Sequence, residues 1–171
     1  METKVTTPVI KGLIISMILI VIGLAIYFTG QVANKSLGYL QYLILFAGIL
    51  WGCIHYAKQL NGNVSFGNVF AHGFKTTAVV TVILVLYTVL ALTVLFPEMK
   101  DKLIEQAELE MEKQSMSDSQ REQAVSMMKN YMMPFAIAGI LFFFMVIGLI
   151  ASLIGAAAAN KKPLDPFQQP L

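Results

Sequence analysis

The stretch MPFAIAGILFFFMVIGLIASLIGAAAA, residues 133–159, decides the fold because it contains no charged side chain. A bilayer-spanning helix needs about 20 apolar residues. Three more uncharged windows cover residues 13–29, 39–57 and 76–96. Every backbone N–H and C=O in hydrocarbon must be paired within its own element, so runs of this length predict helices. We therefore predict an all-α integral membrane protein with four transmembrane helices, at about 9–29, 39–57, 76–96 and 133–159.

The overall composition agrees with a membrane protein. Of the 171 residues, 57% are hydrophobic and 13% are charged, whereas soluble domains carry about 25% charged residues. The net charge of +2 and the lack of a basic patch with interleaved aromatics argue against nucleic-acid binding. The first apolar window is longer than the core of a secretory signal, and three spans follow it, so we expect it to be kept as a helix.

The distribution of Lys and Arg predicts the orientation. An even number of spans puts both termini on one side, and the Lys and Arg counts of the two sides are equal. On one side, however, the charges lie in short flanks with few acidic residues: the N-terminus, the segment 58–75 and the tail. Positive charge close to a span resists translocation most strongly. We therefore expect both termini in the cytoplasm, with residues 97–132 on the opposite face.

Residues 97–132 form the one sizeable predicted extramembrane segment. Pro97 and Glu98 suit the first turn of a helix, and Ser119 with Glu122 fits a capping box for a second helix over 120–132. The apolar stripe of the first helix is Met99, Leu103, Ala107 and Met111. The sequence thus predicts an extramembrane amphipathic helical hairpin between spans three and four, which either connects the spans or docks a partner through its methionines.

Pro134 and the tail complete the predicted organisation. Pro134 is expected to reset the chain at the entry to span four. Residues 161–171 contain three prolines and no apolar periodicity, so we predict a disordered tail. Residues 1–160 then form a single four-helix transmembrane domain.

The stretch SFGNVFAHGF, residues 65–74, reads as an amphipathic helix. Ser65 is a good N-cap residue. Phe66, Phe70 and Phe74 lie on one face, where aromatic rings would sit at headgroup depth or against a partner. The helix is expected to run on through Lys75 into span three.

Small residues four positions apart predict a packing face on every span. Such residues let helix backbones approach closely in lipid. These residues are Gly12 and Ser16 in span one, Gly48 and Gly52 in span two, Gly73, Thr77 and Thr81 in span three, and Gly148, Ser152 and Ala156 in span four. They indicate a compact four-helix bundle, and they serve equally well as a homo-oligomer face.

No set of residues indicates catalysis. The carboxylates are confined to the predicted hairpin, and no charged residue lies deep in a window; Lys11, at the end of span one, is expected to snorkel to the surface. His55 and His72, with Cys53 nearby, suggest a metal or haem site, but neither a carboxylate partner nor a ligand spacing accompanies them. We expect no enzyme activity and no cofactor, and interfacial histidines that bond to water or lipid phosphate.

Several of these features together resemble a known family. The order of four spans, SFGNVFAHGF before span three, the hairpin rich in Met and Glu, MPF at 133–135 and GLIASLIGAAAANKKP at 148–163 are similar to the bacterial membrane family catalogued as domain of unknown function 4199. The resemblance implies an inner-membrane protein of Bacteroidetes-type bacteria with no assigned activity. It supplies no catalytic residues.

Three functional hypotheses follow. The first is a non-enzymatic scaffold or partner subunit of a membrane complex, which uses the hairpin and the phenylalanine helix. The second is a small oligomeric transporter or channel whose selectivity rests on hydroxyls such as Thr81 and Thr88. The third is a haem-binding redox protein with His55 and His72 as ligands.

Overall fold

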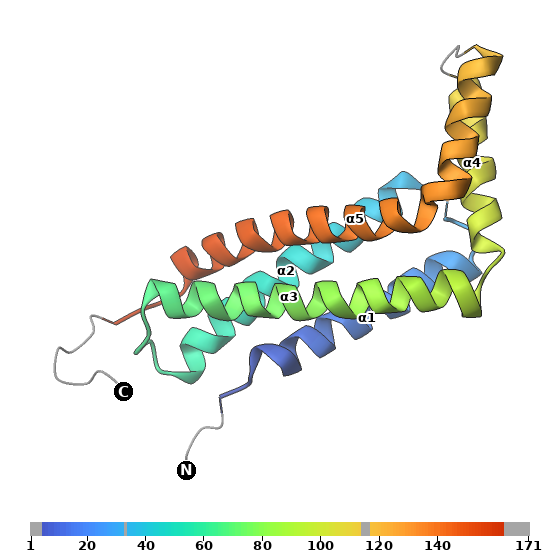
Figure 1. Ribbon diagram of the computed structural model, residues 1–171. Helices are drawn as coiled ribbons and strands as arrows, with labels where there is room; N and C mark the ends of the chain where they lie inside the picture. Colours follow the sequence, from blue (N-terminus) through green and yellow to red (C-terminus); the bar gives the residue numbers. More distant parts are fainter. Residues whose placement is uncertain (1–4, 33, 114–116, 163–171) are drawn as a thin grey trace.

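The computed structural model describes residues 5–32, 34–113 and 117–162, which form helices and no strand (Figure 1). The elements are α1 (Pro8–Phe28), α2 (Lys35–Gln59), α3 (Phe66–Leu90), the π-helical segment η1 (Ala91–Leu95), α4 (Met99–Lys113) and α5 (Asp118–Ala158). Four of the helices are long and apolar enough to cross a membrane: α1, α2, α3 with η1, and α5. The prediction of an all-α protein with four such helices is confirmed.

The starts of α1 and α3 follow from local capping. Thr7 precedes Pro8 and accepts a hydrogen bond from the backbone N–H of Ile10, and proline suits the first helical position. Ser65 accepts from the N–H of Asn68, as an N-cap residue does. The helix that begins at Phe66 therefore continues without a break into span three, as the sequence predicts. The π-helical turn at its far end was not predicted.

The four long helices pack in one layered group around α3. Helix α3 contacts α1, α2 and α5, and α2 also contacts α1 and α5. Leu45, Ile49, Val80 and Ala151 are fully buried between them. Large apolar side chains on the outward faces are more than half exposed: Val21 on α1, Leu43 on α2, Leu86 on α3 and Phe142 on α5. So much exposed apolar surface is unfavourable in water and favourable in the hydrocarbon of a membrane.

The closest approach of α3 and α5 is made by two complementary pairs. A side chain at Gly148 would lie 2.7 Å from Cβ of Thr77, and one at Gly73 would lie 2.8 Å from Oγ of Ser152. Each glycine thus faces a hydroxyl residue of the opposite helix. Thr77 and Ser152 donate their hydroxyl protons to carbonyls within their own helices, at Gly73 and Gly148. The contact is therefore close, and neither hydroxyl is left without a partner.

The segment between spans three and four differs from the prediction. Helix α5 is one continuous helix of 41 residues with Pro134 inside it, so the predicted separate helix over 120–132 and the reset at Pro134 are wrong. Proline removes one backbone hydrogen bond and bends a helix, and membrane helices tolerate it. Figure 1 shows the first half of α5 turning away from the packed helices and running beside α4. We call α4 together with residues 118–132 the arm.

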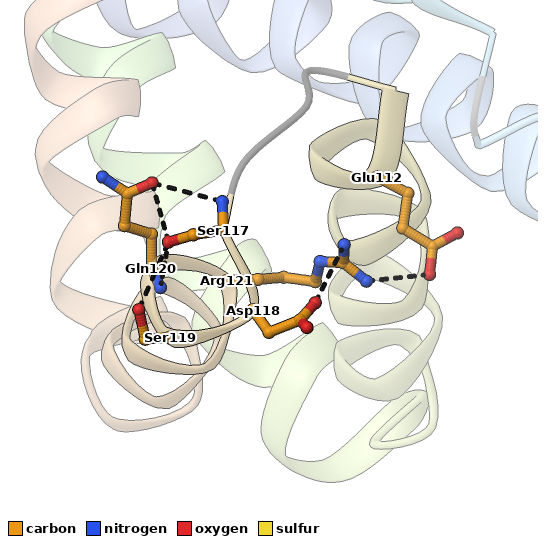
Figure 2. Close-up of polar contacts among 6 residues, drawn as sticks. All are labelled: Glu112, Ser117, Asp118, Ser119, Gln120 and Arg121. Carbon is orange, nitrogen blue, oxygen red and sulfur yellow. Dashed lines mark hydrogen bonds and ion pairs between the residues drawn. The ribbon is translucent and has the colours of Figure 1, made fainter.

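The capping box of the arm also lies at a different place from the one predicted. Ser117, rather than Ser119, is the N-cap residue, and its partner is Gln120 rather than Glu122 (Figure 2). Both pairs have the required spacing, so the sequence alone does not choose between them. Arg121 then contacts Glu112 of α4 at 3.3 Å and Asp118 at 3.6 Å. Exposed ion pairs contribute about 0–1 kcal/mol, so the pair with Glu112 orients α4 and α5 more than it holds them together, and the pair with Asp118 lies within α5.

Contacts near the far end of α1 attach the arm to the packed helices. Tyr27 donates a hydrogen bond of 2.5 Å to Glu98, and Nζ of Lys102 lies 5.3 Å from the centre of the Tyr27 ring. The hydrogen bond from Tyr27 is the main reason that the pKa of Glu98 is lowered. This contact therefore favours the ionised carboxylate, and it weakens as the pH falls through the pKa of Glu98.

The two ends of the described chain lie together, at the turn between α2 and α3. Thr6 and Gln59 exchange two hydrogen bonds of 3.1 and 2.7 Å, and the N–H of Lys162 donates to the carbonyl of Gly62 at 2.9 Å. We call this the terminal end. Of the tail predicted to be disordered, Lys161 and Lys162 have defined positions here, and residues 163–171 lie outside the described residues.

The α3–α5 contact generates a test in one helix. We expect Gly148→Ala to lower the free energy of unfolding by about 1–3 kcal/mol, because the new methyl group overlaps Thr77. Gly139→Ala is the matched control, since no atom lies within 4 Å of a side chain built there. Thermal unfolding in detergent measures both.

A compensating variant checks the cause. Thr77→Gly in the Gly148→Ala background removes the overlapping atoms and should recover part of the loss. Equal unfolding midpoints for the two alanine variants would contradict this account of the helix contact.

Candidate functional site

Lys11 is completely buried in the interior, near the terminal end. Its Nζ donates a hydrogen bond of 2.9 Å to the carbonyl of Gly52 on α2 and lies 5.6 Å from the centre of the Tyr56 ring. The expectation that this lysine snorkels to the surface is therefore wrong. A Cβ at Gly52 would lie 3.6 Å from Cδ of the lysine, an ordinary contact distance, so the lysine stem packs directly against this part of α2. A glycine predicted to pack two helices thus also supplies the carbonyl that binds a cation.

Burying this ammonium group costs more free energy than its contacts with the surrounding residues return. Taking an ammonium ion out of water costs several kcal/mol even after the protein relaxes. A hydrogen bond to a charged group returns about 1.5–3 kcal/mol, and an ammonium has three protons to place. Within the described residues every acidic side chain lies between Glu98 and Glu122, near the opposite end of α1. A charge kept in the interior without a carboxylate partner is a functional candidate.

His72 and Tyr56 complete a polar cluster around Lys11. The His72 ring stacks on the Tyr56 ring, with centroids 4.1 Å apart and an interplanar angle of 15°. His72 is 6% exposed, and its Nε2 atom has no hydrogen-bond partner among the described residues. Buried polar atoms usually have a partner, so an orphaned ring nitrogen calls for an explanation. The cluster therefore combines a buried cation with an unused hydrogen-bonding atom.

A pocket of about 390 Å³ opens beside this cluster. One wall is the strap, which we define as residues 5–8, held against α2 by the two hydrogen bonds between Thr6 and Gln59. The other walls come from α2 and α3. They consist of Tyr56, Asn68, Ala71, His72 and Lys75. We call this cavity the strap pocket, and its volume falls in the range of small-molecule sites.

A second cavity, of about 350 Å³, lies toward the arm. Its lining is mostly apolar and includes Tyr27, Tyr87, Thr88 and Leu103. A neighbouring cavity of about 220 Å³ shares Tyr87 and Thr88 with it. Thr81, by contrast, is buried and donates its hydroxyl proton to the carbonyl of Thr77. Of the two hydroxyls expected to line a path, only Thr88 borders these cavities.

The remaining residues of the predicted packing faces lie between helices α1, α2 and α3. Side chains at Gly12 and Gly48 would meet Val79 of α3 and Ile15 of α1, respectively, at 3.0 Å or less. Ser16 is buried and donates to the carbonyl of Gly12 at 2.7 Å. The structure thus places small residues of every span at contacts within one chain.

The predicted phenylalanine stripe has a defined geometry. Phe66, Phe70 and Phe74 stack in sequence, with ring centroids 6.5 and 6.0 Å apart. Nζ of Lys161 lies 5.2 Å from the centre of the Phe66 ring. The stripe therefore contacts Lys161, near the end of the described chain, through Phe66. On the arm, Met111 is half-buried, and Leu103 borders the apolar cavity.

The two histidines have separate ring environments. His55 stacks on Trp51 of its own helix, with centroids 5.1 Å apart, whereas His72 stacks on Tyr56. Over the described part of the chain, no group of three or more His, Cys, Asp or Glu side chains is arranged to hold a metal ion. Haem ligation by His55 and His72 stays a prediction.

Sequence reasoning did not identify Lys11, Tyr56 and the strap as parts of a site. A usable signal existed for two of them. Lys11 directly precedes Gly12 at the start of an apolar window, and Tyr56 follows Gly52 by one helical turn. A lysine beside small residues can be buried where its long stem finds space on the facing helix. The facing helix itself is known only from the fold.

The comparisons with known proteins identify one family. The family described as "Protein of unknown function (DUF4199)" matches residues 11–161. No curated protein and no solved structure matches the chain.

The energetics of Lys11 lead to a prediction that separates a structural role from a functional one. We expect Lys11→Met to leave the thermal unfolding midpoint unchanged or to raise it, because an apolar side chain of similar length removes the desolvation cost. Lys11→Glu should lower the midpoint strongly, since a carboxylate there would face the carbonyl of Gly52. A large loss of stability in Lys11→Met would show that the hydrogen bond to Gly52 holds the fold together.

Proposed function

The chain belongs to this family of unknown function, and we propose that it acts in the bacterial inner membrane as a non-enzymatic scaffold or partner subunit of a membrane complex. The observation that carries the proposal is the arm. It projects from the packed helices (Figure 1) and bears exposed apolar side chains on an otherwise charged surface. Exposed apolar side chains that gather into one patch on a polar surface mark protein contacts, and we propose that those of the arm do so.

Three side chains mark the proposed contact surface. Leu109 on α4 and Met127 and Tyr131 on α5 are each more than half exposed. Met127 and Tyr131 are four residues apart, so they share a face of their helix. Methionine and tyrosine are adaptable contact residues that are enriched at interfaces. We name these three residues the arm patch.

The proposed placement in the membrane follows from charge. The four long helices form a transmembrane bundle, and the arm is an extramembrane helical hairpin on the periplasmic side. At the terminal end, Lys58, Lys75, Lys161 and Lys162 occur with no acidic residue in the described chain nearby, which supports a cytoplasmic location. The arm carries the acidic residues and crosses the direction of the packed helices in Figure 1, so it would lie along the membrane surface.

A second candidate function is a small oligomeric transporter, which two observations favour. Cavities occur toward both ends of the packed helices, and Lys11 lies buried next to one of them. Lys11 has no exposed surface and lines neither cavity, so transport would require helix movement there. If vesicles containing the protein pass no more solute than protein-free vesicles, and Lys11→Met changes nothing, this candidate fails.

The arm patch yields a quantitative prediction. Replacing Leu109, Met127 and Tyr131 together by Gln should reduce the amount of cross-linked partner in native membranes by roughly 100-fold, since a few buried apolar anchors carry most of an interface's energy. Cross-linking followed by quantitative mass spectrometry of the tagged protein measures the change.

The matched control keeps the apolar surface and changes charge. Glu105, Glu122 and Lys129 are exposed on the same arm, and replacing all three by Gln should alter the recovered partner by a much smaller factor. Equal recovery from both triple variants would contradict a contact through the arm patch.

A further inference from the structure

The strap pocket lies beside several positively charged groups, and no acidic side chain of the described residues lines it. Lys75 borders it, and the ammonium of Lys11 lies close to its inner wall, beside Tyr56. The described acidic residues are all confined to 98–122, near the other end of α1. An anion entering this pocket would therefore meet cations, and no carboxylate of the described residues competes with it there.

Two helix starts add to this positive field. Helix α1 begins with the pair Thr7–Pro8, and both residues line the pocket. Helix α3 begins at Phe66, and Asn68 in its first turn lines the same pocket. The N-terminus of a helix carries a partial positive charge and favours anions. In this fold two such ends converge on one cavity.

His72 gives the independent sign that a ligand belongs there. It lines the pocket, is more than nine-tenths buried, and leaves Nε2 without a partner among the described residues. With its proton on Nε2, a neutral imidazole donates one hydrogen bond. The Tyr56 ring, stacked against it, fixes the imidazole plane. Nε2 itself has almost no accessible surface, so a ligand that accepts its hydrogen bond has to enter deeper than the present wall of the pocket.

The size of the pocket narrows the class of ligand. A volume of about 390 Å³ lies in the range occupied by small organic ligands and is more than a bare oxyanion needs. Lysine and helix N-termini are common partners of phosphate groups in proteins. The pocket lies at one end of membrane-spanning helices, where a lipid headgroup and a soluble molecule are both within reach.

We propose that the strap pocket binds a phosphate ester, with Lys75 at its mouth, His72 Nε2 as a hydrogen-bond donor and Lys11 as a buried counter-charge. The phosphate belongs either to an anionic phospholipid headgroup or to a soluble phosphate ester. The proposal is independent of the arm and of the partner that the arm contacts.

The test uses the full-length protein and one probe for each source. Isothermal titration of detergent-solubilised protein with sn-glycerol 3-phosphate reports on a soluble ester, with glycerol as the uncharged control. Native mass spectrometry of protein released from nanodiscs of mixed phosphatidylcholine and phosphatidylglycerol reports on a retained anionic lipid.

The variants separate this site from general surface charge. Lys75→Gln removes the exposed cation at the pocket, and Lys58→Gln is its matched control, because Lys58 is exposed at the same end but does not line the pocket. His72→Phe keeps a ring against Tyr56 and removes Nε2. We expect Lys75→Gln and His72→Phe each to weaken binding roughly tenfold or more, as loss of a charge-assisted or buried hydrogen bond does.

Each result bears on the proposal. Glycerol phosphate binding that both pocket variants weaken, and Lys58→Gln does not, supports a soluble ester. If the anionic lipid is retained, both pocket variants weaken its retention, Lys58→Gln does not, and glycerol phosphate does not bind, the result supports a lipid headgroup as the ligand. If neither probe binds, or if Lys58→Gln has the same effect as Lys75→Gln, the proposal is overturned. The thermal unfolding midpoint of each variant, matched to wild type, shows that a loss of binding is not a loss of fold.

Discussion

The convergence of three helices at Cys53 is the constraint on which the rest of the arrangement depends. A side chain at Gly155 of α5 would lie 2.7 Å from Cβ of Cys53, and the thiol also fills the space beside Gly73 of α3. Membrane helices gain little from apolar burial against one another, because lipid is equally apolar. Close packing therefore has to come from small residues. At Cys53 three helices pack closely against one another through such residues.

That convergence also determines where Lys11 can lie. Gly52 directly precedes Cys53, so the packing that fixes Cys53 also fixes the carbonyl that accepts the hydrogen bond from Lys11. The lysine stem passes along the backbone at Gly52, and its ammonium lies over the ring of Tyr56, which stacks on His72. The polar cluster thus lies directly beside a close contact of three helices. Rigid packing of this kind keeps the buried ammonium group, whose burial is unfavourable, in one position.

The sequence predicts those features that depend on composition and local spacing. Four long apolar runs predict the four spans, and Ser65 predicts the start of α3 because its capping bond is formed within one turn. The sequence does not distinguish the capping pair Ser117–Gln120 from Ser119–Glu122, which have equal spacing. It also gives no sign that α5 continues through Pro134 instead of ending there. Neither outcome follows from local spacing alone.

Lys11 shows why the candidate site could not be predicted from local sequence patterns. A lysine near the end of an apolar window normally reaches the membrane surface, and that interpretation needs no neighbour. Its ammonium instead donates to the carbonyl of Gly52 in another helix, 41 positions along the chain. Helix α1 itself packs only on one side, against α2 and α3, and its other face is apolar and exposed. The close contacts of Gly12 with Val79 and of Ile15 with Gly48 hold it against α3 and α2, and the hydrogen bonds from Lys11 to Gly52 and from Tyr27 to Glu98 add a polar contact near each of its ends.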